Sequence, residues 1–485
     1  MSRKLSPALV CAAAASALVL SSTAAAPAGA QTSSLSSDGG SSLISSSDGT
    51  DGGAPKKPPS KTASRPVSMP NGTTIQVMDD VLGRYSAHVG FRAGDLGMMA
   101  PVGTGEEFAM LFGDSFTISF GQGLWMSPVG VLAKMNEDGF IEIIRPLNDG
   151  DRVEPLVTYF RRDMETLLPS DIINIGGTLY MQAMWNESLH NVTKTEIFKS
   201  TNNGKKWTSV ATTSHDYYDG IGDLITWEKG PDGYIYVMST TFTRSEPVYL
   251  SRFRAKDIAD RGKWEFYRRS TGEWNKGIAE PILEKNVKAG EMNLRYIDGH
   301  WVLVMFNEET LSVEVRISDR IDRNWDDITP AKIAEHGRWS LPQTPVNWSQ
   351  PYGGYIVPGS TLDNMDIVVS QWNTETNRRY MSTQFNVKGL DTFFGVERKA
   401  VPDDSVIWVD ELPATDLPQM DAEDNLVAEQ APRSSSSSDL SSGSSEGART
   451  AGIVIGVLAG AGVLAFLAAP LLKQVLPEPI ANLIP

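Results

Sequence analysis

Two aspartates, Asp95 and Asp114, have the residue type and spacing for acid–base chemistry. They flank a segment that is typical of a β-hairpin turning at residues 103–106, and in that register paired residues have numbers that add to 209. The two side chains are therefore expected to be cross-strand neighbours, with Cβ atoms about 4.5–5.5 Å apart. Carboxylates this close repel each other, so one keeps its proton near neutral pH. One acid and one carboxylate are what glycosidic cleavage requires. The alternative is that both aspartates only end strands, as aspartate often does.

Further polar and aromatic residues stand near the ends of predicted strands and are candidates for contact with substrate. They are Asp223, Glu291, His88, Trp125, Trp348, Tyr352 and Trp372. For each of them the alternative is an ordinary turn or core position.

Composition excludes several classes of function. The 43 Lys and Arg against 59 Asp and Glu leave a net charge of −16, which disfavours binding to nucleic acid. Cys11 is the one cysteine, and the five histidines include no HExxH pattern, so we expect no zinc site and no cysteine nucleophile. No cofactor and no metal ion are expected.

Short β-rich runs fill the middle of the chain and repeat a common pattern: a glycine-containing turn followed by an aromatic and β-branched strand. The turn glycines are Gly105, Gly177, Gly233, Gly299 and Gly354. Five such units predict an all-β fold, a five-bladed β-propeller, in which a ring of blades leaves few free strand edges. Four-stranded blades are expected, with 108–112, 178–182, 234–238 and 301–305 among the innermost strands. A pair of β-sandwiches is the alternative.

The two ends of the chain predict export and a membrane anchor. Basic residues, an apolar run and a small-residue stretch ending at Ala30 are typical of a secretory signal peptide. The uncharged stretch Ala451–Leu472 is long enough to cross a bilayer. The predicted segments are a signal peptide over 1–30, a disordered linker over 31–66, the propeller over 67–411, a second disordered linker over 412–450, the transmembrane anchor over 451–472 and a short cytoplasmic tail over 473–485. Within the anchor, Gly452, Gly456 and Gly460 share one helix face that could support weak self-association.

Several motifs together resemble a known family. They are Ala93-Gly94-Asp95-Leu96-Gly97, Leu111-Phe112-Gly113-Asp114-Ser115-Phe116, Gly290-Glu291-Met292-Asn293-Leu294-Arg295-Tyr296, Pro351-Tyr352-Gly353-Gly354-Tyr355 and Ser370-Gln371-Trp372. Over roughly residues 80–400 the chain resembles the domain of unknown function numbered 4185, now glycoside hydrolase family 183, the endo-D-arabinofuranases. The resemblance implies a five-bladed propeller that cuts α-linked D-arabinofuranose chains of arabinogalactan and lipoarabinomannan. Carried over by position, the family's paired acids fall on Asp95 and Asp114.

The sequence thus favours a membrane-anchored glycoside hydrolase of the cell envelope, with its catalytic domain outside the membrane and arabinan as its polysaccharide partner. A propeller that binds glycan for wall adhesion or scaffolding, without cutting it, is the alternative. The turn at 200–207 resembles a sialidase Asp-box, but no arginine cluster can be assigned to bind a sialic acid carboxylate.

Overall fold

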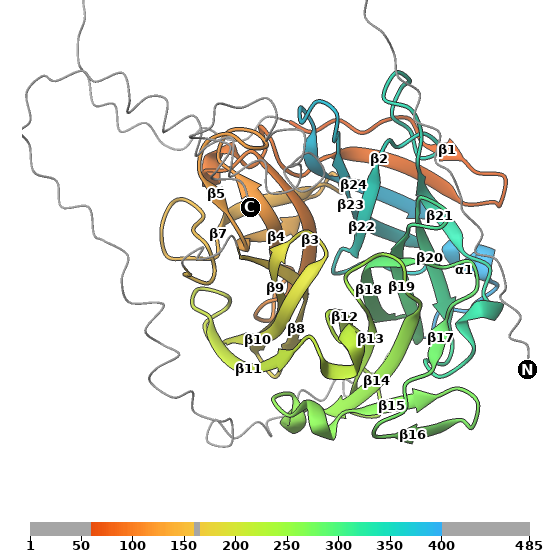
Figure 1. The fold of residues 1–485 in the computed structure, drawn as a ribbon. Coiled ribbons are helices and arrows are strands. Elements are labelled where there is room, and N and C mark those ends of the chain that lie inside the picture. The colour runs from red at the N-terminus through yellow and green to blue at the C-terminus, as the bar shows by residue number, and fades with distance from the viewer. Residues whose placement is uncertain (1–59, 160–164, 400–485) are drawn as a thin grey trace, which may run out of the picture. The chain divides into compact units, whose positions relative to one another are not determined.

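The computed structural model describes residues 60–159 and 165–399. Five antiparallel sheets surround one axis, as Figure 1 shows, so the prediction of an all-β, five-bladed β-propeller is confirmed. The sheets contain five, four, six, four and five strands, so the expected four strands per blade are present with additions.

Each blade begins with its innermost strand and continues outward by antiparallel neighbours. The first consists of β3 (Ala93–Pro101), β4 (Phe108–Phe116), β6 (Val129–Met135) and β7 (Ile141–Pro146), with β5 (Trp125–Met126) paired to the end of β4. The second consists of β8 (Thr166–Ile175), β9 (Thr178–Ser188), β10 (Asn191–Ser200) and β11 (Thr208–Ser214). The third consists of β12 (Leu224–Lys229), β13 (Tyr234–Thr240), β14 (Val248–Arg254), β15 (Glu265–Arg268) and β16 (Glu273–Asn275), with β17 (Pro281–Leu283) on β14.

The fourth blade consists of β18 (Ala289–Ile297), β19 (His300–Asn307), β20 (Ser312–Ser318) and β21 (Ala331–Glu335). The fifth consists of β22 (Pro351–Ile356), β23 (Asn364–Trp372), β24 (Tyr380–Lys388), β2 (Thr74–Asp80) and β1 (Val67–Ser68). Short helical segments join the strands: η1 (Ala87–Val89), η3 (Tyr217–Gly220), η4 (Ala255–Asp257), η5 (Arg261–Lys263) and η6 (Trp325–Asp327). A short helix, α1 (Leu390–Phe394), follows β24.

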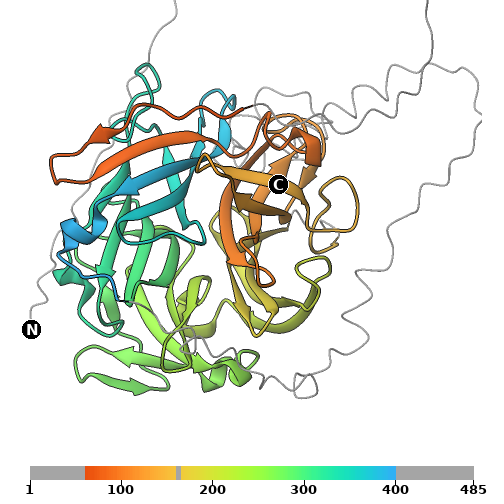
Figure 2. The ribbon, with the colours of Figure 1, turned by 180° about the vertical axis from the view of Figure 1, so that it is seen from behind.

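The fifth blade closes the ring, because its strands come from both ends of the folded segment. β2 pairs with β24 in antiparallel register, from Thr74 opposite Lys388 to Asp80 opposite Thr383. The two strands lie side by side in both views, in red and in blue (Figure 2). This pairing joins two segments about 300 residues apart in sequence and covers the edge that β24 would otherwise expose.

The prediction of which strands lie innermost was wrong, because each predicted run lies one strand further from the axis. The runs 108–112, 178–182, 234–238 and 301–305 lie in β4, β9, β13 and β19, each second from the axis. These strands are the most apolar because neighbouring blades cover both of their faces, and every residue of β19 is buried. The strands at the axis are richer in glycine and polar residues, since five of them share a narrow space.

Four of the five repeat glycines occupy the predicted turn after an inner strand, and the fifth does not. Gly354 lies within β22 with φ of 151°, and the corresponding turn of the fifth blade contains Gly359 instead. Gly354 is required where it stands, because a Cβ there would lie 2.8 Å from Val304 of the fourth blade.

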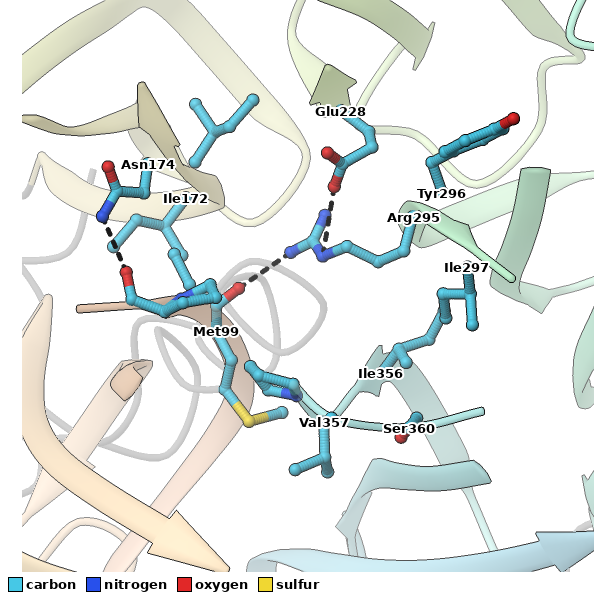
Figure 3. A pocket seen from close by; sticks show the side chains of 15 residues that line it. Met99, Ile172, Asn174, Glu228, Arg295, Tyr296, Ile297, Ile356, Val357 and Ser360 are labelled. Carbon is cyan, nitrogen blue, oxygen red and sulfur yellow. Dashed lines mark hydrogen bonds and ion pairs between the residues drawn. The ribbon is translucent and has the colours of Figure 1, made fainter. Parts of the chain in front are cut away.

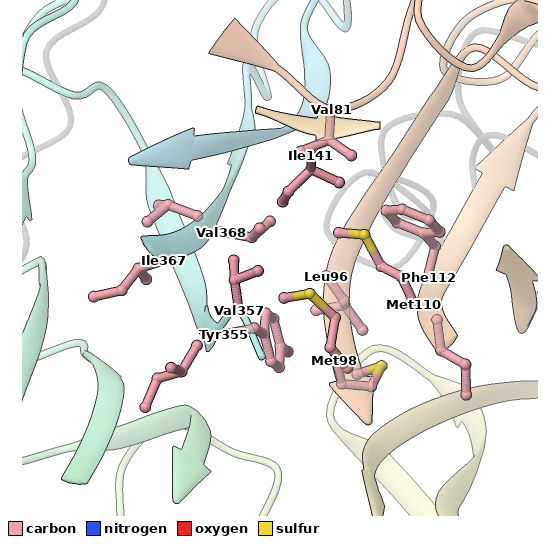
Figure 4. Packing of buried hydrophobic residues seen from close by; sticks show 14 of the residues in the cluster. Val81, Leu96, Met98, Met110, Phe112, Ile141, Tyr355, Val357, Ile367 and Val368 are labelled. Carbon is pink, nitrogen blue, oxygen red and sulfur yellow. The ribbon is translucent and has the colours of Figure 1, made fainter. Parts of the chain in front are cut away.

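Blade-to-blade packing forms the core around the first and fifth blades (Figure 4). Met98 and Met110 of the first blade are fully buried, as is Val368 of the fifth. Gly97, with φ of 137°, makes this contact possible, since a Cβ would lie 2.9 Å from Met110 and 3.1 Å from Val368. The start of β3 is thereby held close against the fifth blade.

A polar network crosses the axis and joins inner strands of different blades. Asp171 of β8 is fully buried and accepts hydrogen bonds from the Thr226 hydroxyl at 2.7 Å and from Arg295 at 3.1 Å. Arg295 also donates to the Met99 carbonyl at 2.9 Å, and Asn293 accepts from the Ile356 N–H at 3.0 Å. All five inner strands are connected, so the network separates one mouth of the propeller from the other.

Among the described residues, no helix has the length and apolar character needed to span a bilayer. The predicted signal peptide, the predicted anchor with its three glycines and the cytoplasmic tail lie outside the described residues and stay predictions.

Candidate functional site

One mouth of the propeller, at which the inner strands begin, gathers most of the predicted site residues. Asp95 is the third residue of β3, Glu291 the third of β18 and Tyr352 the second of β22, while Asp223 immediately precedes β12. We call this end the entry mouth, and the end at which the inner strands finish the exit mouth.

Asp95 and Asp114 face each other across a β-bulge. The register pairs Ala93 with Phe116 and Met98 with Leu111, as the hairpin prediction requires. Between Gly94 and Leu96 it shifts, so that Asp95 alone stands opposite both Gly113 and Asp114. An extra residue in one strand turns local side chains away from regular alternation. Both carboxylates therefore belong to the same irregular point of the hairpin.

The backbone at this bulge is in an uncommon conformation that the fifth blade stabilises. Leu96 has φ of 65°, which a branched side chain rarely adopts. Its N–H donates to the Ser370 hydroxyl at 2.8 Å, and the Ser382 hydroxyl donates to its carbonyl at 2.7 Å. Two buried serines thus fix the residue next to Asp95, and with it the direction of the Asp95 side chain.

Asp95 is the most perturbed acid of the entry mouth. Burial and the nearby Asp114 carboxylate raise the pKa of Asp95 to about 8, with a further contribution from Glu291. The hydroxyls of Tyr380 and Tyr352 oppose the shift, and Tyr352 donates to Oδ2 at 3.1 Å. Asp95 is therefore protonated at neutral pH.

The other Asp95 oxygen, Oδ1, has no hydrogen-bond partner within the described residues. It lies against Gly113, where a Cβ would come within 2.7 Å of it. Any larger residue at position 113 would displace the carboxyl group, so the glycine before Asp114 is a requirement of the site.

Asp114 has a different environment. Its Oδ1 accepts a hydrogen bond from the Trp125 indole N–H at 2.8 Å. A charged acceptor makes such a bond stronger than a neutral one does. The indole N–H therefore favours negative charge on Asp114, and Trp125 contacts the acidic pair directly.

Glu291, predicted to contact substrate, is held by an arginine that the sequence analysis did not identify. It is buried, and Arg244 donates to its Oε1 at 2.6 Å. Burial opposes ionisation, but the Arg244 charge and hydrogen bond prevail and lower the pKa of Glu291. The guanidinium also lies 5.4 Å from the Tyr352 ring, so Arg244 and Glu291 form an ion pair behind Tyr352.

Asp223 belongs to a separate cluster of the third blade. Its Oδ2 lies 2.6 Å from His215 Nδ1. Burial raises the pKa of Asp223 to about 6, against the opposing effects of His215 and Arg261. Its side chain contacts His215, so Asp223 belongs to the same mouth but not to the acidic pair.

The predicted aromatic residues divide into two groups. Trp372 is partly exposed, and its ring centroid lies 5.0 Å from that of Phe120 and 5.8 Å from that of Tyr380. The Tyr380 hydroxyl is one of the two that lower the pKa of Asp95. These three rings form an aromatic wall beside the acidic pair. Trp348 is 3% exposed and packs on Phe385, so the structure places it in the core.

His88 also lies away from the acidic pair. Its Nε2 is 3.0 Å from the carbonyl of Ile143 in β7, the outermost strand of the first blade. The contact ties η1 to that strand, which is a structural role.

The residues that sequence reasoning missed are Arg244, His215, Tyr380, Ser370 and Ser382. His215 is eight residues from Asp223, whereas the other four lie at least 47 residues along the chain from the residues that they contact or perturb. Only Ser370 falls within a motif that the sequence analysis used. The roles of Tyr380, Ser370 and Ser382 depend on the closure of the ring, which no local pattern encodes.

A cavity of about 180 Å³ lies at the exit mouth, apart from the acidic pair (Figure 3). Its polar residues include Asn174, Glu228 and Arg295, and burial raises the pKa of Glu228 to about 7. The Asp171–Arg295 network separates it from the entry mouth. Within the described residues, no group of three or more acidic or histidine side chains is placed to hold a metal ion.

Comparisons with known proteins found the following similarities. A protein of Mycolicibacterium smegmatis, described as an uncharacterized 35.9 kDa protein in the asd 3′ region, is 29% identical over 279 residues, 54% of this chain and 82% of that protein. A Bacteroides ovatus structure described as a candidate hydrolase is 12% identical, covering 70% of this chain and 98% of its own, with a TM-score of 0.49. An α-L-arabinofuranosidase from Podospora anserina is 10% identical, covering 64% and 95%, with a TM-score of 0.38.

A family assignment comes from the sequence itself. Residues 82–386 match the family described as Domain of unknown function (DUF4185), and the match spans all five inner strands and the Asp95–Asp114 hairpin. The chain belongs to the DUF4185 family.

Proposed function

We propose that the protein is a glycoside hydrolase in which Asp95 is the general acid and Asp114 is the nucleophile or base. One observation carries the proposal: two carboxyl groups meet at the bulge of the entry mouth, and one of them has its pKa raised to about 8. A buried acid that keeps its proton next to an ionised partner is the asymmetry that glycosidases use. A protein that only binds a neutral glycan needs hydrogen bonds and aromatic surface, but not two crowded carboxylates.

The chemistry follows from this asymmetry. Asp95 transfers its proton to the glycosidic oxygen while the bond from that oxygen to the anomeric carbon breaks. The anomeric carbon then bonds either to an Asp114 oxygen or to a water molecule whose proton Asp114 removes. Tyr352 holds the Asp95 carboxyl group through its hydroxyl, and Trp125 holds Asp114.

The proposed substrate is an α-D-arabinofuranosyl chain of cell-envelope arabinan. The motifs shared with glycoside hydrolase family 183 support this choice, and the partly exposed Phe120 and Trp372 of the aromatic wall offer ring faces on which a sugar can stack. The predicted signal peptide and anchor would hold the propeller outside the membrane, where that polysaccharide is found.

The test is incubation of the full chain with purified arabinogalactan, with released oligosaccharides measured by chromatography. Asp95→Asn and Asp114→Asn should each lower turnover by about 10²-fold or more. Asp138→Asn, an exposed aspartate in the β6–β7 turn of the exit mouth, is the matched control and should retain activity. Binding of arabinan without any product from the wild-type chain would support the non-catalytic alternative, a glycan-binding propeller for wall adhesion.

A further inference from the structure

Most of the exposed aliphatic side chains of the propeller gather at one end. Among residues 60–159 and 165–399, the large hydrophobic residues classed as exposed are Ile118, Leu124, Leu189, Ile278, Leu311, Leu341 and Val346. Six of them lie in a connection that follows the second strand of a blade or leads from β21 to the next inner strand, β22, while Ile278 follows β16, the fifth strand of the third blade. Because strands alternate in direction within a blade, the connections of the six are on the side of the entry mouth. Apart from Ile278, the described connections on the side of the exit mouth carry none.

The most exposed pair lies on a loop that the fold holds in place. Ile118 is 59% and Leu124 70% exposed, at the two ends of a loop between β4 and β5 that contains no charged residue. Thr117 N–H donates to the Leu124 carbonyl at 3.1 Å, and Leu124 N–H donates to the Thr117 hydroxyl at 2.9 Å. Phe120, at the tip, packs 4.9 Å from Tyr380. The ring is therefore turned inward while the two aliphatic side chains point away from the core.

We infer that the entry mouth docks on a lipid surface through these loops. Singly exposed apolar residues are common, but six of these seven lie on the loops of one face. These six stand on four separate loops and form no continuous groove for a protein segment, whereas a deformable acyl layer accepts separate insertions. They are also all aliphatic, while the aromatic residues suited to sugars lie further in, beside Asp95.

The predicted anchor would bring a lipid surface close to the propeller. By its sequence, the uncharged stretch Ala451–Leu472 is long enough to insert into a bilayer. With a net charge of −16, attraction to anionic lipid is not the driving force, which leaves apolar contact. In this orientation the glycan that reaches Asp95 is one carried by the same lipid layer. That consequence rests on the proposed function, but the contact with lipid does not.

The contact can be tested by fluorescence on the full chain. Cys11 is replaced by serine, and an environment-sensitive fluorophore is attached to Leu124→Cys, to Leu341→Cys or to Glu106→Cys. Glu106 is the matched control, because it is exposed on the β3–β4 turn of the same blade as Leu124 but at the exit mouth. Each labelled protein is mixed with phosphatidylcholine vesicles that contain a spin-labelled phosphatidylcholine as quencher, after circular dichroism has verified the fold.

Labels at 124 and 341 should lose most of their fluorescence, and the label at 106 should keep it. Adding Ile118→Ser and Leu124→Ser to the Leu341→Cys protein should raise the lipid concentration for half-maximal quenching by on the order of 10-fold per residue. Equal quenching of all three labels, or no quenching at 124 and 341, would overturn the inference. So would lipid-independent self-quenching that grows with protein concentration, since it would mean that a second copy covers the face. None of these readouts depends on catalysis, so they remain interpretable if arabinan is not cleaved.

Discussion

Replacing Asp95 by asparagine should remove activity and, at the same time, stabilise the protein in a pH-dependent way. The pKa of Asp95 is raised from 3.8 to about 8 in the folded state. Because the folded pKa is the higher one, the folded protein binds a proton that the unfolded chain has released at every pH between these values. The free energy of unfolding of the wild type therefore falls with rising pH across that window, by about 1.4 kcal/mol per pH unit.

The asparagine side chain of the Asp95→Asn variant does not titrate, so the variant lacks this loss. Relative to wild type, the variant's stability should be constant below about pH 4, rise between about pH 4 and pH 8, and level off above. A shift of roughly four units sets an upper limit of about 5–6 kcal/mol on the rise, and water near the carboxyl group should reduce it to on the order of 2–4 kcal/mol. Any constant cost of placing an amide beside Gly113 cancels when the slopes are compared.

The assay is urea unfolding of both proteins at several pH values, monitored by tryptophan fluorescence. Asp138→Asn is the control, and its free energy of unfolding should vary with pH as that of the wild type does. A difference between Asp95→Asn and wild type that does not vary with pH would refute the elevated pKa, and with it the assignment of Asp95 as the general acid. If Asp95→Asn loses activity but its difference from wild type in the free energy of unfolding does not vary with pH, Asp95 acts as an ionised group.

Three further outcomes follow from the same contacts. Tyr352→Phe removes a hydrogen bond that lowers the pKa of Asp95, so the alkaline limb of the pH profile of kcat/KM should move upward, and a downward shift would contradict the role given to Tyr352. Trp372→Leu removes a ring of the aromatic wall and should raise KM for arabinan by about 10-fold with little change in kcat, as measured by steady-state kinetics; an unchanged KM would place the sugar elsewhere. Arg295→Ala leaves Asp171 as an unpaired buried charge and should destabilise the propeller by about 3–5 kcal/mol, and an unchanged melting temperature would show that the axial network carries no stability.

The sequence by itself determined the repeat and the acidic pair. Aromatic and β-branched runs separated by glycine turns recur at a spacing that suits one blade, and this is a local property of the chain. The hairpin register is local as well, since the chain between Asp95 and Asp114 is short and its pairing follows from the position of one turn. Both predictions therefore needed only neighbouring residues, and the pairing of Ala93 with Phe116 agrees with them.

The tertiary structure alone decided which strand faces the axis and how the acids differ. Apolar content pointed to β4, β9, β13 and β19, because burial is greatest between blades, but the axis favours small and polar residues. The bulge at Leu96 depends on Ser370 and Ser382, more than 270 residues away. The distinction between Asp95 and Glu291 depends on Arg244, which reaches Glu291 from a loop of another blade. The contacts of Ser370 and Ser382 form only when the ring closes, and Arg244 reaches Glu291 only when neighbouring blades pack, so no pattern within a single blade could reveal them.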